Sequence, residues 1–329
     1  MFRSLYFTPD KTVQSDLPLK DLPLLTKSKR GLLWVDFSGE APEACQPILE
    51  QFGFHPLAID DALQERHTPK VDDWGDYLYL VLDTLHLLNA GPSGWETESE
   101  ELDVFLGRNF VVTHHDWPIP AVEEVWANLP RDLRTLQEGA DHLLYKIIDR
   151  LTSDYMQLVE QLDIAIGEIE DEVFDQPTRS TLERLFSLKR ALQTMRRIIT
   201  PQRELMNKLA RDDFAVIDPR DRIFFRDVYD HMVRLHDLNE SLRDLVSAVL
   251  DTYLSVINNR MNEVMKTLTI ITTLFMPLTF VTGFFGMNFF ESTGLFKTWT
   301  GAHFFYPTLA SMIFIPIGMY YWMRRRTWL

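Results

Sequence analysis

The chain has 329 residues, a formal net charge of −15 and a mean hydropathy close to zero. This acidic balance argues against nucleic acid as a partner, because phosphate binding needs clustered Lys and Arg; it favours cations instead. The near-neutral hydropathy limits any membrane part to a small share of the chain, and the single cysteine, Cys45, excludes an intramolecular disulfide.

Residues 1–125 alternate between strand and helix signals. β-rich runs bounded by turn residues lie at 31–37, 77–88 and 102–113, and helical segments lie at 41–52 and 56–65. The start of the chain lacks the basic residues, apolar core and small-residue cleavage site of a signal peptide. We therefore predict a cytoplasmic α/β domain over residues 1–125.

The next part of the chain is helical. Apolar residues recur at helical spacing over 143–172 and 178–209, and Asp175-Gln176-Pro177 separates the two runs. This pattern predicts a cytoplasmic helical hairpin within 126–217. Asp218-Pro219 then predicts the start of another helix, since aspartate caps helices and proline suits the first helical position.

This third helix is predicted to be unusually long. No Gly or Pro occurs from Asp221 until Pro277. A helix over 218–285 would be about 100 Å long at 1.5 Å per residue. It cannot bury an apolar face alone, so we expect it to pack against the preceding helices or copies of itself.

Two apolar stretches at the C-terminal end are free of charge, and each approaches the ~20 residues that cross a bilayer as a helix. They predict a first transmembrane helix at about 268–285, continuous with the long helix, and a second at 303–323. The basic tail, 324–329, favours a cytoplasmic C-terminus. Two spans place the N-terminus on the same side and make 286–302 an external loop.

One face of the long helix carries amide, thioether, hydroxyl and glycine residues at steps of three and four. It continues from Asp251 through Asn262, Met265, Leu268, Thr272, Met276, Thr279 and Gly283. Small and hydroxylated residues in lipid can mark either helix packing or a pore lining, and periodicity alone leaves both open.

Several strings resemble the CorA magnesium/cobalt transport family, whose members carry a Gly-Met-Asn motif. They are FMPLTFVTGFFGMN, the basic end RRRTWL, HPLAIDDAL (55–63), RHTPKVDDWGDYLYLVL (66–82), FLGRNFVVT (105–113), FRDVYDH (225–231) and NEVMKTLTIITTLFMPLTF (262–280). The resemblance covers nearly the whole chain. It implies a funnel-shaped homopentamer in the cell inner membrane whose first spans line the pore, with the residues of that face facing the lumen.

The resemblance also implies the pore mouth. Gly286, Met287 and Asn288 form the motif, and a ring of Asn288 amides would bind a hydrated ion, because Mg²⁺ gives up its waters reluctantly. The external loop departs from the family pattern, and its only acid, Glu291, is a candidate for attracting cations. We expect Mg²⁺ as the main ion, with Co²⁺, Ni²⁺ or Zn²⁺ as further candidates.

Five carboxylates match the family's regulatory metal positions. The resemblance implies that Asp61 and Asp251 pair across subunits, and that a neighbouring site uses Asp60, Asp149 and Asp227. Bound Mg²⁺ there would hold the channel closed. The sequence contains neither a phosphate-binding G-x-x-x-x-G-K motif nor an HExxH motif, so we expect no nucleotide and no enzymatic activity.

One weaker candidate for a metal site lies near the end of the last predicted strand. His114-His115-Asp116 could ligate a transition metal, but adjacent residues on a strand point to opposite faces, which favours a structural strand end.

Two alternative functions remain open. The first is a proton-coupled zinc transporter of the same superfamily, although such relatives tend to replace the methionine retained here as Met287. The second is a membrane-anchored cation sensor that conducts nothing.

Overall fold

The computed structural model describes residues 2–28, 31–64, 66–89, 94–287 and 302–326. The chain divides into two compact units, Met1–Tyr253 and Leu254–Leu329, and each is described by itself.

The first unit is built on a seven-stranded sheet of order β2-β1-β3-β7-β6-β5-β4. Strands β3 and β7 pair in parallel, and the other neighbours pair antiparallel. The strands are β1 (Phe2–Phe7), β2 (Val13–Ser15), β3 (Leu32–Ser38), β4 (Lys70–Asp73), β5 (Tyr77–Asn89), β6 (Trp95–Gly107) and β7 (Phe110–His115).

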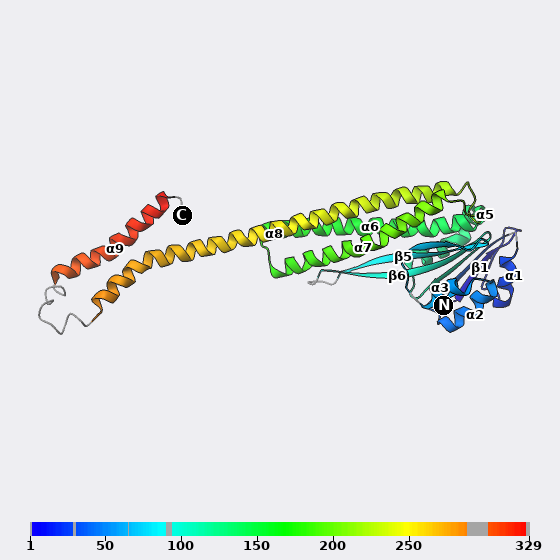
Figure 1. The fold of residues 1–329 in the computed structure, drawn as a ribbon, viewed down its shortest axis with the longest axis horizontal. Coiled ribbons are helices and arrows are strands. Elements are labelled where there is room, and N and C mark those ends of the chain that lie inside the picture. The colour runs from blue at the N-terminus through cyan, green and yellow to red at the C-terminus, as the bar shows by residue number, and fades with distance from the viewer. Residues whose placement is uncertain (1, 29–30, 65, 90–93, 288–301, 327–329) are drawn as a thin grey trace. The chain divides into compact units, whose positions relative to one another are not determined.

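Helices cover both faces of this sheet (Figure 1). One face packs against α1 (Leu22–Thr26), α2 (Pro42–Phe52) and α3 (Pro56–Gln64). The other face packs against α4 (Pro120–Asn128), α5 (Leu133–Glu138), α6 (Ala140–Asp175) and α7 (Arg179–Arg211), and the first part of α8 (Arg222–Phe285) adds its apolar residues to the same core. Short 3-10 turns at Leu19–Asp21 and Leu129–Arg131 complete the unit.

The two-sided cover explains the sequence of the central strands. In β3, Leu32 and Trp34 belong to the core beneath α6 and α7, whereas Leu33, Val35 and Phe37 belong to the core beneath α2 and α3. A strand buried on both faces reads as a continuous apolar run rather than an alternating one. The predicted α/β class is confirmed.

The apolar core is continuous across residues 125 and 217, the predicted ends of the α/β domain and of the helical hairpin. The larger apolar cluster runs from Leu5 of β1 through α6 and α7 to Tyr253 of α8, so the predicted α/β domain and helical hairpin share one interior. The hydroxyl of Tyr253 also donates to the carbonyl of Thr178, at the start of α7, over 3.2 Å. This contact lies at the end of the first unit.

Two sequence predictions about element boundaries are wrong. The run at 102–113 is not one strand, because Arg108 and Asn109 form a two-residue turn between β6 and β7. The long helix begins at Arg222 rather than after Asp218. Asp218 instead closes a turn: its carbonyl accepts from the Asp221 amide at 2.9 Å and its carboxylate accepts from the Arg220 amide at 2.9 Å.

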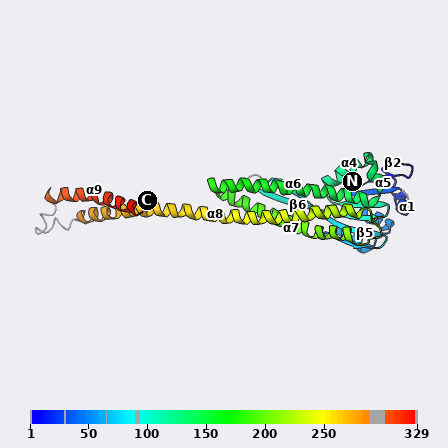
Figure 2. The ribbon, with the colours of Figure 1, turned by 90° about the horizontal axis from the view of Figure 1, so that it is seen from above.

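The second unit contains the C-terminal part of α8 and the helix α9 (Ala302–Arg325), which runs back alongside it (Figures 1 and 2). Half-buried residues of α8 form one stripe, Ile270, Thr273, Leu274, Pro277, Leu278 and Val281. Within the described residues, α8 is the one helix long and apolar enough to qualify as a membrane span by length and composition. The second span therefore stays a prediction.

Candidate functional site

The predicted pore residues lie on one side of α8. Asn262, Met265, Leu268, Thr272, Met276, Thr279 and Gly283 are all exposed in the single chain. At 3.6 residues per turn, their mean direction is opposite to the half-buried stripe that faces α9. The face is thus left uncovered by the chain's own second helix.

The threonine hydroxyls on this face donate hydrogen bonds to backbone carbonyls of the same helix. The Thr279 hydroxyl donates to the Phe275 carbonyl at 3.0 Å, and the Thr272 hydroxyl donates to the Leu268 carbonyl. A hydroxyl that gives its proton to the preceding turn keeps its oxygen lone pairs as acceptors. The outward-facing oxygens are therefore suited to the hydrogens of water.

The motif residues begin where α8 ends. The Gly286 amide donates to the Thr282 carbonyl at 2.8 Å, and the Met287 amide donates to the Phe284 carbonyl at 3.4 Å. The Met287 side chain is 51% exposed. Asn288 and Glu291, the other predicted pore-mouth and loop residues, lie outside the described residues.

Asp61, at the C-terminal half of α3, already has a cationic partner within its own chain. Lys70 Nζ on β4 lies 2.5 Å from Asp61 Oδ2 and 3.1 Å from Asp72 Oδ2. Burial alone would lower the pKa of Lys70, but its hydrogen bonds to the two carboxylates raise it above its ordinary value. His67 adds a second contact, with Nε2 at 3.6 Å from Asp61 Oδ1. A metal at Asp61 would have to compete with Lys70.

Asp149 on α6 and Asp227 on α8 both lie near enough to Tyr145 to act on its hydroxyl. Burial and then the charges of these two carboxylates raise the pKa of the Tyr145 hydroxyl. Asp227 is exposed and Asp149 is half-buried. Two of the three residues predicted for the second regulatory site therefore share one neighbourhood in a single chain.

The remaining two regulatory candidates lie on different helices. Asp60 is exposed on α3, and Asp251 is exposed on α8. Asp251 lies 24 positions beyond Asp227, or about 36 Å along the helix at 1.5 Å per residue. Among the residues that the structure describes, no three or more His, Cys, Asp or Glu side chains form a group that could hold a metal ion. The pairings across subunits stay predictions.

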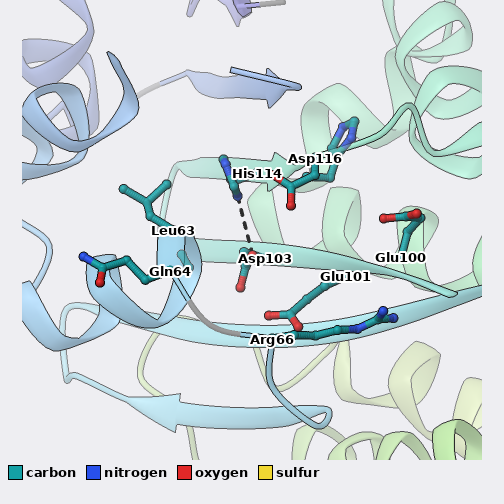
Figure 3. Close-up of a pocket in the computed structure, with 10 residues that line it drawn as sticks. Leu63, Gln64, Arg66, Glu100, Glu101, Asp103, His114 and Asp116 are labelled. Carbon is teal, nitrogen blue, oxygen red and sulfur yellow. Dashed lines mark ion pairs between the residues drawn. The ribbon is translucent and has the colours of Figure 1, made fainter. Parts of the chain in front are cut away.

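A polar cavity that sequence reasoning missed lies on the α3 side of the sheet (Figure 3). It has a volume of about 280 Å³, and its lining includes Arg66, Glu101, Asp103, His114 and Asp116. Burial, and then the charge of Asp103, raise the pKa of Glu101 to about 8. The detectable signal was the pair of acids two residues apart, which places both on one face of the strand, but the further acids Glu96, Glu98 and Glu100 in β6 make this pair hard to single out.

Comparison with known proteins agrees with the fold and with these motifs. The model of the CorA-like Mg²⁺ transporter protein family matches residues 29–325. The chain is 36% identical over 320 residues to the cobalt/magnesium transport protein CorA of Thermotoga maritima, covering 96% of this chain and 87% of that one. It is 34% identical to the putative metal ion transporter YfjQ of Bacillus subtilis, over 94% of each.

More distant proteins share the architecture. The complete structure of the CorA magnesium transporter from Methanocaldococcus jannaschii superposes with a TM-score of 0.82 at 22% identity, over 99% of this chain and 98% of that one. The zinc transport protein ZntB of Yersinia pestis is 26% identical over 90% of this chain and 88% of its own length.

Proposed function

The chain belongs to the CorA-like Mg²⁺ transporter protein family, a family of transporters rather than enzymes, and we propose that it is a passive Mg²⁺ channel assembled as a homopentamer. The observation that carries this proposal is the polar and thioether face of α8, which is exposed on the side opposite to α9. Five such faces, one from each copy, would enclose an axial pathway.

The chemistry of this face suits a hydrated cation. Mg²⁺ keeps much of its water shell, so a pore for it needs acceptors for water hydrogens rather than a cage of carboxylates. Thr272 and Thr279 offer hydroxyl oxygens as acceptors, and Gly283 leaves room near the outer end. Met265, Leu268 and Met276 would form the apolar constriction that closes by dewetting.

The outer mouth is assigned to the motif that follows α8. A ring of Asn288 amides would hold the ion through its waters without trapping it, and Gly286 and Met287 would set the position of that ring at the helix end. Glu291 in the loop would attract cations from outside. Transported Mg²⁺, and possible Co²⁺ or Ni²⁺, would thus be selected by neutral oxygen ligands at this mouth.

The membrane potential is a sufficient driving force. One elementary charge gains about 2.3 kcal/mol per 100 mV, so a divalent ion gains about 4.6 kcal/mol. Because each 1.4 kcal/mol is about tenfold in an equilibrium, this supports a gradient of roughly a thousandfold. The orientation we propose has both termini in the cytoplasm and two spans in the inner membrane.

We assign gating to the acidic residues of the first unit. Asp61 and Asp251 would meet across subunits, and Asp60, Asp149 and Asp227 would form a neighbouring site. The shared neighbourhood of Asp149 and Asp227 around Tyr145 supports the second of these sites. Facing carboxylates at 4 Å repel by about 4 kcal/mol at an effective dielectric near 20, and bound Mg²⁺ would remove this repulsion. Falling internal Mg²⁺ would then separate the subunits and open the pore.

Flux into proteoliposomes tests the proposal. Purified protein should admit Mg²⁺ at low internal Mg²⁺ under an inside-negative potential, and high internal Mg²⁺ should stop it. Asn288→Ala should reduce the flux by at least about tenfold, the loss expected when a well-placed polar contact worth about 1.4 kcal/mol is removed. Asn128→Ala, at the exposed end of α4, is the matched control and should leave the flux unchanged. A monomer in membrane mimics would contradict the proposal.

The similarity to ZntB supports one second candidate, a proton-coupled zinc transporter. It predicts Zn²⁺ uptake that follows the external pH and excludes Mg²⁺. Retention of Met287 favours the magnesium channel. A protein that binds these ions but conducts none of them would instead be the membrane-anchored sensor.

A further inference from the structure

Two adjacent histidines at the end of β7 have very different surroundings. Both are buried, with 4% of His114 and 1% of His115 exposed. His115 has a close polar partner at each ring nitrogen: its Nδ1 lies 2.6 Å from the Trp117 carbonyl oxygen, and its Nε2, although not hydrogen-bonded, makes an ion-pair contact of 3.2 Å with Asp36 Oδ1. His114 points to the other face of the sheet, where neither of its ring nitrogens makes a hydrogen bond.

The His114 ring faces the polar cavity described above. Figure 3 shows Asp103 between His114 and Glu101, with α3 residues on one side of the space. Asp103 and His114 are direct cross-strand partners in the β6–β7 register. Glu101 precedes Asp103 by two residues and therefore shares its face of the sheet. Three potential metal-binding side chains thus line one side of a 280 Å³ cavity.

The spacing of Asp103 and His114 fits two ligands of one ion. Asp103 Oδ2 lies 3.6 Å from His114 Nδ1, which is too long for a hydrogen bond. Donors at about 2.0–2.1 Å from a tetrahedral ion are roughly 3.4 Å apart. The Tyr79 hydroxyl donates to Asp103 Oδ1 at 2.6 Å and holds the carboxylate with its other oxygen toward His114. Such an outer hydrogen bond is typical of metal-binding carboxylates.

The charges around the cavity also favour a cation. Glu101 and Asp103 are both largely buried acids on one face of β6, where a bound cation would favour their charged forms. Arg66 does not neutralise them by a direct contact: its Nη2 is engaged by Asp83 at 3.3 Å and by the carbonyl and hydroxyl of Ser99, each at 2.7 Å. The Glu101 carboxylate accepts the His67 backbone amide at 2.7 Å, and His67 Nδ1 lies 4.0 Å from Glu101 Oε1.

We propose that Asp103 and His114 bind a divalent transition-metal ion, Zn²⁺, Co²⁺ or Ni²⁺, in this cavity, with the Glu101 carboxyl group beside it. Imidazole with carboxylate suits these ions better than Mg²⁺, which prefers oxygen ligands alone. Two protein ligands are in place, and water completes the coordination, in keeping with the lack of a three-residue group among the described residues. The site is separate from the pore face of α8.

Cobalt titration of the metal-free full-length protein in detergent tests this site. Saturating Mg²⁺ is present throughout to fill oxygen-only sites, and bound Co²⁺ is followed by its visible absorption and by equilibrium dialysis. We expect one Co²⁺ per chain that resists Mg²⁺. His114→Gln and Asp103→Asn should each weaken its binding by at least about tenfold, as loss of a metal contact does. Glu101→Gln should weaken it less, because it removes a neighbouring carboxyl group without removing either ligand.

Controls separate this site from the channel. His231→Gln, at an exposed histidine on α8, should leave the Mg²⁺-resistant Co²⁺ unchanged. Wild-type protein without such an ion would overturn the proposal, as would equal affinity in wild type, His114→Gln and Asp103→Asn. If His114→Gln does not fold, the Asp103→Asn result decides. Mg²⁺ flux on the same preparations reports on the proposed channel independently, so either conclusion can fail alone.

Discussion

Lys70 Nζ sits 2.5 Å from Asp61 Oδ2, so the carboxylate that we assign to regulation already has a positive partner in its own subunit. Both side chains are about one-third exposed, at 31% and 32%. Solvent therefore screens the pair, and an ion pair of this kind contributes at most about 1 kcal/mol. That is small enough for a divalent cation to displace Lys70, yet large enough to change the Mg²⁺ concentration at which displacement occurs.

Lys70→Met should make the channel close at lower internal Mg²⁺. Removing a competitor worth about 0.5–1 kcal/mol predicts a 2- to 5-fold fall, roughly, in the half-inhibiting concentration. The measurement is Mg²⁺ flux into proteoliposomes over a series of internal concentrations. Lys20→Met, an exposed lysine of the first 3-10 turn, serves as the control. An unchanged or higher half-inhibiting concentration in Lys70→Met would show that Asp61 is not the regulatory ligand.

Thr279→Cys should become sensitive to a membrane-impermeant, positively charged thiol reagent. Thr279 lies on the face assigned to the pore, whereas Leu278 lies on the stripe that faces α9. The reagent should block most Mg²⁺ flux in Thr279→Cys and little in Leu278→Cys. The native Cys45 does not interfere, because it is fully buried and burial, followed by the charge of Glu40, raises the pKa of its thiol to about 11. Equal block of both variants would remove the assignment of this face.

Asp36→Ala should destabilise the sheet by about 3–5 kcal/mol, the usual cost of breaking a buried charge pair. Asp36 is fully buried and accepts from Arg3 Nε at 2.8 Å and from the Thr113 hydroxyl at 2.5 Å. Urea unfolding followed by tryptophan fluorescence measures the loss, and Asp10→Ala in an exposed turn is the control.

Asp36 also makes the free energy of unfolding depend on pH. Burial alone would raise the pKa of Asp36, but His115, Thr113 and Arg3 together hold it below its ordinary value. A lowered pKa in the folded state stabilises above the unfolded pKa near 3.9, and this contribution is lost as the pH falls through the folded pKa. Wild-type protein should therefore lose more stability on acidification than Asp36→Ala. Parallel curves would contradict this assignment.

Asp221 should have the opposite pH dependence. Burial, and then the charge and hydrogen bond of Asp141, raise the pKa of Asp221 to about 7. His142, Glu138 and Asp218 also surround it, with His142 Nδ1 at 3.8 Å from Asp221 Oδ1. The folded protein therefore keeps a proton that the unfolded chain releases near pH 3.9, so this group's contribution is lost as the pH rises from about 4 to about 7.

Asp221→Asn should flatten this part of the pH profile. The amide is neutral at every pH and removes the repulsion with Asp141. Thermal unfolding of the full-length protein between pH 4.5 and 7.5 measures the slope. The exposed Asp230→Asn should keep the wild-type slope. An equally steep fall in Asp221→Asn would place the raised pKa elsewhere in the cluster.

Most of the architecture could be predicted from residue patterns, because the long elements have strong periodicity and clear boundaries. The predicted segments at 41–52 and 143–172 correspond to α2 and to most of α6, and Pro177 lies between α6 and α7 as expected. The edge strands β2 and β4 escaped notice, since three or four residues carry too little pattern to stand out. The Arg108-Asn109 turn lacks the usual Asn-Gly signal.

The candidate sites were predictable to different degrees. Stepping along α8 by threes and fours found a face that α9 leaves uncovered, because helix geometry alone fixes which residues share a side. The cavity at His114 depends on strand register instead. Asp103 lies opposite His114 only because the turn at Arg108-Asn109 has two residues, and one residue more would have moved every partner to the other face. The cavity is therefore missed when 102–113 is treated as a single run without this turn.

The uninterrupted stretch of α8 before Pro277 has a mechanical consequence. α8 is helical without a break from Arg222 to Phe285, so in the gating that we propose a movement near Asp227 would be passed along the helix to Met265. Pro277 has no amide proton, which leaves the Thr273 carbonyl without its usual helical partner. α8 therefore lacks one backbone hydrogen bond within its apolar segment, which is where a proline lets a helix kink.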